Sequence, residues 1–280
     1  MSNMIPEKVL NDGTKIPAIG FGTAFIKGAA GVQVLNNAID AGYRLIDSAF
    51  NYENEGVVGQ AVRQSSVPRE ELRISSKLPG RHHAYKEALE TIEESLFRAG
   101  LDYYDLYLIH WPNPKTDRYL EAWQAMIEAK KRGYVRSIGV SNFLPEHLDR
   151  IIQETGVAPS VNQIELHPYF HQEEQRAKDA EHGIVTESWS PLGRGHDMLR
   201  DETIAGIAAA HGKTPTQVIL RWHIQLGAVP IPRASSLEHQ KENLGIFDFE
   251  LSEAEMQVFA RFNRKDGRLW DQNPAEYEEM

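Results

Sequence analysis

The sequence contains no cysteine among its 280 residues. Disulfide bonds and metal sites built on thiolates are therefore excluded. Basic residues are also scarce relative to acidic ones, with 30 Lys and Arg against 40 Asp and Glu and a formal net charge of −10. A nucleic-acid surface needs clustered Lys and Arg to neutralise phosphates, so we expect no nucleic-acid partner.

Long hydrophobic runs are missing as well. No apolar stretch approaches the roughly 20 residues that a membrane-spanning helix needs. The first residues, MSNMIPEKVLNDG, do not show the charged and then apolar pattern of a secretory signal peptide. The sequence therefore predicts a cytoplasmic protein with no membrane partner.

What the sequence does contain is an alternation of short apolar runs with longer segments of helical period. The runs are residues 18–22, 43–47, 72–77, 104–110, 135–141, 160–165, 183–188 and 228–232. Such alternation predicts an α/β fold in which helices cover a parallel sheet. Before the first run, Asn11, Asp12 and Gly13 predict the turn of an N-terminal β-hairpin.

Signals at the segment ends support the helices between these runs. We expect helices that start near Val32, Glu55, Tyr85, Arg118, Leu144 and Gln172, and two more within residues 202–212 and 214–227. Glycines that follow helical segments predict C-terminal caps at Gly100, Gly133, Gly183 and Gly212. Thr214 and Ser252 each begin a capping box, which predicts the N-termini of two helices.

Two α/β architectures suit eight strands, a closed (β/α)8 TIM barrel and an open doubly wound sheet. The open sheet would want a G-x-G-x-x-G turn after its first strand, but the chain offers only GFGT at residues 20–23. We therefore expect residues 1–280 to form a single barrel domain. The tail after Gly267 is expected to be irregular and to end in a flexible acidic segment.

Ionisable residues stand where three of the apolar runs end. In barrels of this type the active site is built at the carboxyl ends of the strands, and these positions hold Asp47, Lys77 and His110. A buried charge is costly unless it is paired, and Asp47 and Lys77 come from neighbouring strands. Tyr52 lies just beyond the second strand. We expect these four side chains to converge on one rim.

This combination suits the reduction of a carbonyl group. Hydride transfer to carbon leaves an alkoxide, which must receive a proton, and Tyr52 is the predicted donor. The ammonium of Lys77 would lower the pKa of the phenol, and Asp47 would hold Lys77 in place. His110 would donate a hydrogen bond to the carbonyl oxygen.

A series of motifs surrounds these residues: LNDGTKIPAIGFGT, GYRLIDSAFNYENE, SSKLP, DLYLIHWP, IGVSNF, VNQIELHP and SWSPLG. From Lys8 to about Arg268 the chain resembles the aldo-keto reductase family, and is most similar to short-loop microbial members of the 2,5-diketo-D-gluconate reductase type. The resemblance places the four catalytic residues of the family at Asp47, Tyr52, Lys77 and His110. It also implies a monomer.

The resemblance further implies a nicotinamide dinucleotide that is held without a Rossmann turn. Ser141, Asn142 and Gln163 would bind the carboxamide, and Trp189 would stack on the nicotinamide ring. The remaining implied contacts are Gly22 and Thr23 in the floor of the cofactor site, Ser190, Leu192 and Gly193 at the pyrophosphate, and Glu242 and Asn243 at the adenine.

The segment IPRASSLEHQKEN departs from the family pattern for binding the 2′-phosphate of NADP. The family commonly has a lysine, a serine and a later arginine, where this chain has Arg233, Ala234 and His239, with Ser235 beside them. Arginine keeps a permanent charge, whereas histidine is largely neutral at pH 7. We expect NADP(H) to be preferred, but less strictly, and NAD(H) to support some turnover.

Aromatic residues should form the walls of the substrate pocket, namely Phe25, Phe50, Trp111 and Trp270. The loops at residues 113–117 and 194–200 are short, and a site without long lids should be open and permissive. We expect small carbonyl compounds as substrates, including aldehydes, α-keto esters and keto-sugar acids.

Two other functions are compatible with a barrel. A metal-dependent hydrolase would use Asp47, His110 and His167 as ligands, but it usually has a His-x-His pair after an early strand and would leave Lys77 close to the metal. We therefore expect no metal site. The second is a non-catalytic redox sensor that binds the nicotinamide cofactor, and the complete set of four side chains weighs against it.

Overall fold

A parallel sheet of eight strands forms the centre of the computed structural model, which describes residues 5–194 and 197–280. The strands are β3 (Phe21–Gly22), β4 (Leu45–Asp47), β5 (Arg73–Leu78), β6 (Tyr104–Ile109), β7 (Val135–Ser141), β8 (Val161–Glu165), β9 (Val185–Trp189) and β10 (Val229–Pro230). They pair in sequence order from β3 to β10. Each lies within or overlaps a predicted apolar run, so the predicted strands are confirmed.

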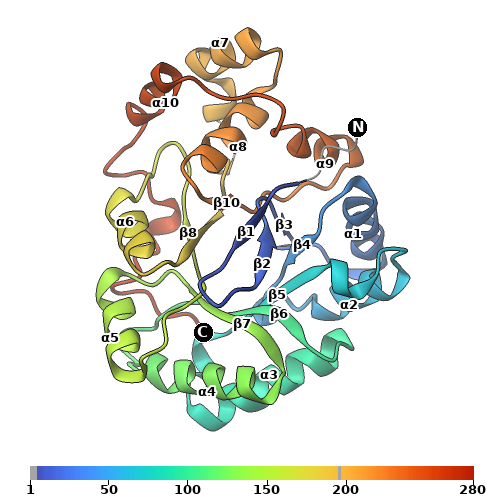
Figure 1. The fold of residues 1–280 in the computed structure, drawn as a ribbon, viewed down its shortest axis with the longest axis vertical. Coiled ribbons are helices and arrows are strands. Elements are labelled where there is room, and N and C mark those ends of the chain that lie inside the picture. Colours follow the sequence, from blue (N-terminus) through green and yellow to red (C-terminus); the bar gives the residue numbers. More distant parts are fainter. Residues whose placement is uncertain (1–4, 195–196) are drawn as a thin grey trace.

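The sheet closes on itself. The amide of Gly20 donates to the carbonyl of Pro230 at 3.0 Å, and the amide of Gly22 donates to that of Pro232 at 3.1 Å. These bonds join the β3 edge to the β10 edge. Helices surround the strands on the outside (Figure 1), and the arrangement is the predicted (β/α)8 barrel.

The helices are α1 (Gly28–Ala41), α2 (Glu55–Gln64), α3 (Tyr85–Ala99), α4 (Tyr119–Arg132), α5 (Pro145–Thr155), α6 (Glu173–Glu181), α7 (Glu202–His211), α8 (Pro215–Gln225), α9 (Leu237–Leu244) and α10 (Glu253–Ala260). Most begin close to the predicted starts, and α1 begins ahead of Val32. Helix α9 was not predicted, because its buried residues, Gln240 and Asn243, are polar and leave no apolar period.

The capping signals are mostly confirmed. Thr214 and Ser252 form the predicted capping boxes of α8 and α10. Gly100, Gly133 and Gly212 are left-handed C-caps, as expected. Helix α6 instead ends at Glu181 with His182 as its C-cap, and Gly183 follows as the next residue with a φ of 66°.

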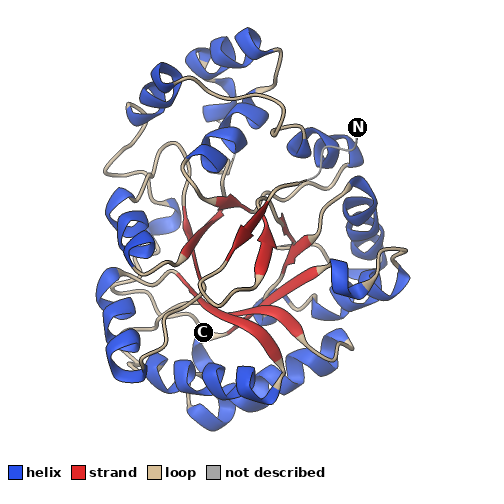
Figure 2. Cartoon of the chain, in the orientation of Figure 1, coloured by secondary structure: helices blue, strands red, loops and turns tan. Residues whose placement is uncertain are grey.

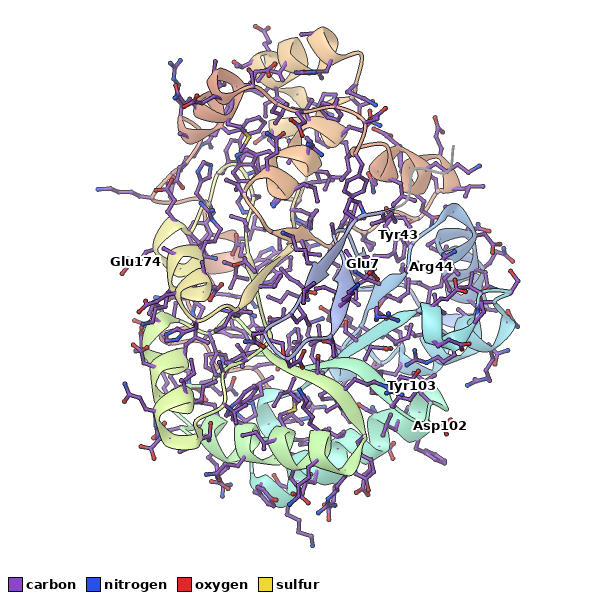
Figure 3. All side chains as sticks on the ribbon, in the orientation of Figure 1. Glu7, Tyr43, Arg44, Asp102, Tyr103 and Glu174 are labelled. Atoms are coloured by element: carbon purple, nitrogen blue, oxygen red, sulfur yellow. The ribbon has the colours of Figure 1, made fainter. Side chains whose placement is uncertain are left out.

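The predicted N-terminal hairpin, β1 (Glu7–Val9) with β2 (Lys15–Pro17), lies across the middle of the ring of strands (Figures 1 and 2). Leu10 and Ile16 are buried with inward-facing residues of the barrel strands, namely Leu45, Leu106, Leu108, Val161 and Val229. Side chains fill the interior of the barrel (Figure 3). The hairpin therefore covers the end of the barrel that lies opposite the carboxyl ends of its strands.

The C-terminal tail corrects one expectation. It contains the 3-10 turn Leu269–Asp271 and is otherwise irregular, as predicted. Its acidic end is not a free segment, however, because Glu279 is buried at 8% exposure and Glu278 accepts a hydrogen bond from the amide of Lys115 at 2.7 Å. The last residues are thus part of the packed structure.

Gly59 in α2 allows a test of how closely the outer helices pack. A Cβ atom added at Gly59 would lie 1.6 Å from the carbonyl oxygen of Ala99, at the end of α3. We expect Gly59→Ala to lower the free energy of unfolding by about 3 kcal/mol, because α2 and α3 must move apart.

The matched control is Gly206→Ala in α7, where an added Cβ has open space. This change should raise stability by up to about 1 kcal/mol, because alanine favours a helix more than glycine does. Urea denaturation of both variants measures the difference. Equal stabilities would show that the contact between α2 and α3 is not tight.

Candidate active site

A cavity of about 590 Å³ opens at the carboxyl ends of the strands. Its lining includes many of the residues predicted from the sequence: Gly22, Thr23, Asp47, Tyr52, His110, Ser141, Asn142, Gln163, Trp189, Ser190, Leu192 and Arg233. Phe25, Trp111 and Trp270 line it too. The strand ends thus bring residues from most of the chain to one hollow.

Asp47 and Lys77 form a buried ion pair beneath this cavity. Strands β4 and β5 are neighbours, and Lys77 Nζ lies 2.7 Å from Asp47 Oδ2 and 2.7 Å from the carbonyl oxygen of Ser48. Burial by itself would lower the pKa of Lys77, but the negative charge of Asp47 and the nearby Tyr52 outweigh it and raise that pKa. Lys77 is therefore held as an ammonium ion.

Tyr52 faces both Lys77 and His110. It ends the 3-10 turn Phe50–Tyr52 after β4, and Lys77 Nζ lies 5.2 Å from the centroid of its ring. The rings of Tyr52 and His110 meet edge to face with centroids 5.8 Å apart. Burial raises the pKa of Tyr52, and the charge of Lys77 only partly offsets this rise. The net shift is opposite to the one expected, because burial of the phenol cannot be measured from the sequence, and it keeps the phenol protonated.

A carboxylate that sequence reasoning missed completes this group. Glu279, the penultimate residue, places its Oε1 atom 2.7 Å from Nδ1 of His110. No periodic pattern or strand end marks Glu279, and it lies in a tail without regular structure. The sequence therefore carried no signal that could connect it with His110.

Gln163 is fixed by two carboxyl groups. Its side-chain amide nitrogen donates to Asp47 Oδ1 at 3.0 Å and to Glu187 Oε2 at 2.9 Å. Both amide hydrogens are thus used, and the amide oxygen remains available to accept a bond from a ligand. Glu187, also missed from the sequence, lies on β9, where burial and the charge of Asp47 raise its pKa to about 8.

Asn142 and Trp189 are linked above β7 and β9. The side-chain amide of Asn142 donates to the carbonyl of His110 and to Ser141 Oγ, each at 3.0 Å, and its oxygen accepts a bond from Trp189 Nε1 at 2.7 Å. The ring of Trp189 is nearly parallel to that of Trp270, at 7° and 6.3 Å between centroids. The cavity therefore has a fixed, flat aromatic face.

Cations line the mouth of the cavity. Arg194, which was not predicted, lies 4.0 Å from the ring centroid of Trp270, and Arg233 donates to the carbonyl oxygen of Ala24 at 3.3 Å. Residues 195–196, in the 194–200 loop that was expected to be short, lie outside the described residues. Two guanidinium groups at the mouth favour an anionic ligand group such as a phosphate.

Phe50 is a correction among the predicted wall residues, because it does not line this cavity. It is buried against the guanidinium of Arg98, 3.9 Å from its ring centroid, and against His82. In a 3-10 turn of three residues per turn, Phe50 and Tyr52 point in different directions. Only Tyr52 can therefore face the cavity.

Several predicted cofactor contacts lie outside the lining of the cavity. Ser235 and His239 are exposed at the start of α9, and Asn243 is buried on the same helix. Glu242 accepts a hydrogen bond from Thr214 Oγ1 at 2.5 Å, and Gly193 follows Leu192 in a left-handed conformation. Ser235 and His239 do lie close in sequence to Arg233, and the roles of all five residues stay predictions.

The proposed metal ligands do not meet. Asp47 is bound by Lys77, Ser75 and Gln163, and His110 faces Glu279. His167 is buried against Glu165, with Nε2 and Oε1 2.9 Å apart. Each of the three side chains is thus engaged with a different partner.

Comparisons with known proteins place these observations in a family. The sequence description of the "Aldo/keto reductase family" matches residues 18–264. The chain is 51% identical over 276 residues to 2,5-diketo-D-gluconic acid reductase B of Corynebacterium sp. (strain SHS752001), with 99% of each chain covered. It is 46% identical to an aldo-keto reductase of Mycobacterium avium (strain 104), and the alignment covers 92% of this chain and 90% of the relative.

Solved structures agree with this result. A Gox0644 variant in complex with NADPH superimposes with a TM-score of 0.93 at 41% identity, with 98% of each chain covered. A Bombyx mori aldo-keto reductase in complex with NADP superimposes with a TM-score of 0.87 at 35% identity, with 94% of each chain covered.

Proposed function

The chain belongs to the aldo/keto reductase family, and from this premise we propose that it reduces small aldehydes and ketones to alcohols, with NADPH as the hydride donor and Tyr52 as the general acid. The family and the NADPH-bound relatives identify an NADP-dependent oxidoreductase. The observation that carries the proposal is the meeting of Tyr52, the Asp47–Lys77 pair and His110 at one cavity.

The residues present fit a nicotinamide cofactor. The carboxamide of nicotinamide carries hydrogen-bond donors, and the free oxygen of Gln163 can accept from them. The ring of Trp189 offers a face for stacking, while Arg194 and Arg233 can hold the phosphates. When bound, the reduced cofactor supplies the hydride.

Tyr52 would provide the proton that the resulting alkoxide requires. Its burial keeps the phenol protonated at neutral pH, which is the form needed for reduction. Lys77, held by Asp47, places a positive charge where the phenol oxygen becomes negative as it releases the proton. His110, whose ring meets that of Tyr52, would bind the carbonyl oxygen.

The substrate range is proposed to be broad and to consist of small carbonyl compounds. Phe25 is 68% exposed and Trp270 is 55% exposed, so the aromatic walls at the mouth are open to solvent. The name of the Corynebacterium relative adds keto-sugar acids to the candidates. Aromatic walls accept apolar or flat groups of a substrate and do not select a particular arrangement of its hydroxyl groups.

The direct test is oxidation of NADPH, followed at 340 nm, against a panel of aldehydes, α-keto esters and keto-sugar acids. We expect turnover with several of them and no loss of activity after treatment with EDTA. Cofactor binding without any turnover would favour the redox-sensor alternative. Hydrolytic activity that is lost on chelation would favour the metal-dependent hydrolase.

Cofactor choice is expected to depend on pH, because His239 replaces the usual arginine near the 2′-phosphate. An imidazole side chain gains charge as the pH falls from 8 to 6. Since an exposed ion pair contributes little, we expect the ratio of kcat/KM for NADPH to that for NADH to rise about 2- to 5-fold at pH 6.

The control for this effect is His239→Gln, which removes the imidazole. Any pH dependence of the ratio that comes from protonation of the 2′-phosphate itself remains in this variant. The ratio in this variant should change less with pH than in the wild type. A wild-type ratio that does not depend on pH, or complete rejection of NADH, would contradict the weakened phosphate site.

The protein is also proposed to be a monomeric, single-domain, cytoplasmic enzyme. Within the described part of the chain, no helix is both long and apolar enough to span a bilayer. Light scattering coupled to size-exclusion chromatography would test the monomer. Calorimetry would test the single domain, for which we expect one cooperative unfolding transition.

A further inference from the structure

The main chain of the penultimate residue, Glu279, is anchored independently of its side chain. Its amide donates to Asn113 Oδ1 at 3.0 Å, and its carbonyl accepts from Asn113 Nδ2 at 2.8 Å. The ring of Tyr277, two residues earlier, packs on Trp111 with centroids 4.5 Å apart. The tail therefore does not need the Glu279 carboxylate in order to stay in place.

The carboxylate itself is held at both oxygens and aimed at His110. Oε2 accepts from the amide of Gly80 at 2.9 Å, and Oε1 accepts from Asn51 Nδ2 at 2.8 Å and lies 2.7 Å from His110 Nδ1. Asn51 is oriented in turn by Arg81, which donates to its Oδ1 at 2.5 Å.

Gly80 has little room for any other residue. A Cβ atom there would lie 2.3 Å from Nδ2 of Asn113, the side chain that anchors the tail. The seat of the Glu279 carboxylate is thus built from η1 (Phe50–Tyr52), the start of η3 (Gly80–His82) and the loop after β6.

Glu279 is ionised in this seat. Burial by itself would raise the pKa of its carboxyl, but the charge of His110 and hydrogen bonds from Gly80 and Asn51 outweigh burial and hold that pKa below its ordinary value. An ionised carboxylate only accepts hydrogen bonds, so a proton on the nitrogen of His110 that faces it would complete this contact.

We propose that Glu279 is a positioning residue for His110. Its carboxylate binds Nδ1 of the imidazole and thereby directs Nε2 to the substrate carbonyl. A neutral imidazole with its proton on Nδ1 has no proton on Nε2, whereas the doubly protonated ring donates from both nitrogens. The inference rests on the proposed carbonyl reduction and adds the C-terminal tail to its machinery.

The test is Glu279→Gln, which keeps the shape of the side chain and one acceptor oxygen. We expect kcat for an aldehyde to fall about 10- to 100-fold, which is less than the loss on removing an oxyanion donor outright. The KM values for the aldehyde and for NADPH should change less than twofold. Glu276→Gln is the matched control, because Glu276 is exposed in the same tail, and it should behave like the wild type.

Chemical rescue separates positioning from anchoring. In Glu279→Gly, added formate should restore part of kcat, because a small carboxylate can occupy the seat at Gly80 and Asn51. In Asn113→Ala, which loosens the tail itself, formate should have no effect. Rescue by formate would show that the negative charge itself is needed for turnover. A purely structural contact would not be restored in this way.

Three results would overturn the inference. The first is an unchanged kcat in Glu279→Gln. The second is a loss of kcat that formate does not restore and that Asn113→Ala reproduces, and the third is a rise in kcat/KM, which would make the tail an inhibitor. If the wild type and Glu276→Gln oxidise NADPH with aldehydes, any of these results refutes the role of Glu279 alone. Failure of the wild type to do so refutes the proposed function instead.

Discussion

Replacement of Tyr52 by phenylalanine should lower kcat/KM for aldehyde reduction by about 10²- to 10⁴-fold, the usual contribution of a positioned general acid. The change removes one oxygen and keeps the ring that meets His110 edge to face. The Asp47–Lys77 pair stays intact, so the fold and the binding of NADPH should be retained. Initial rates at 340 nm and quenching of protein fluorescence by NADPH measure the two effects.

Tyr85→Phe is the matched control, because Tyr85 is 40% exposed at the start of α3, away from the cavity. It should leave kcat/KM unchanged. If Tyr52→Phe keeps the wild-type rate, another group supplies the proton, and His110 would be the next candidate. Loss of NADPH binding in Tyr52→Phe would instead assign the phenol to the cofactor site.

The fold and the catalytic group were predictable because they depend on local patterns. A strand buried on both faces is continuously apolar, so an ionisable residue at its end stands out, as Asp47, Lys77 and His110 do. Parallel pairing in sequence order then brings the ends of β4, β5 and β6 to one rim. No long-range information beyond barrel closure is needed to place these three side chains together.

Other features depend on contacts that no local pattern records. Glu279 reaches His110 from the far end of the chain, through a seat made by Asn51, Gly80 and Asn113. Its acidity and terminal position are typical of a solvated tail, so a flexible segment was expected there. That expectation was wrong. The direction of the pKa shift of Tyr52 likewise depends on burial, which a sequence expresses only through the completed fold.

Replacement of Lys77 by methionine should affect stability and catalysis together. Lys77 is fully buried, and its removal leaves Asp47 as an unpaired carboxylate beneath the cavity. We expect the free energy of unfolding to fall by about 3–5 kcal/mol, as when one partner of a buried ion pair is removed. Turnover should fall at least about 10²-fold, because the phenol oxygen loses its neighbouring positive charge. Urea denaturation and the 340 nm assay measure the two losses.

The double variant Asp47→Asn with Lys77→Met separates these losses. It removes the uncompensated charge, so most of the stability should return, while turnover should stay as low as in Lys77→Met. Lys86→Met is the control, since the side chain of Lys86 is 87% exposed and should contribute little. A double variant that recovered both stability and turnover would show that the pair only supports the fold. The ammonium would then have no part in moving the proton of Tyr52.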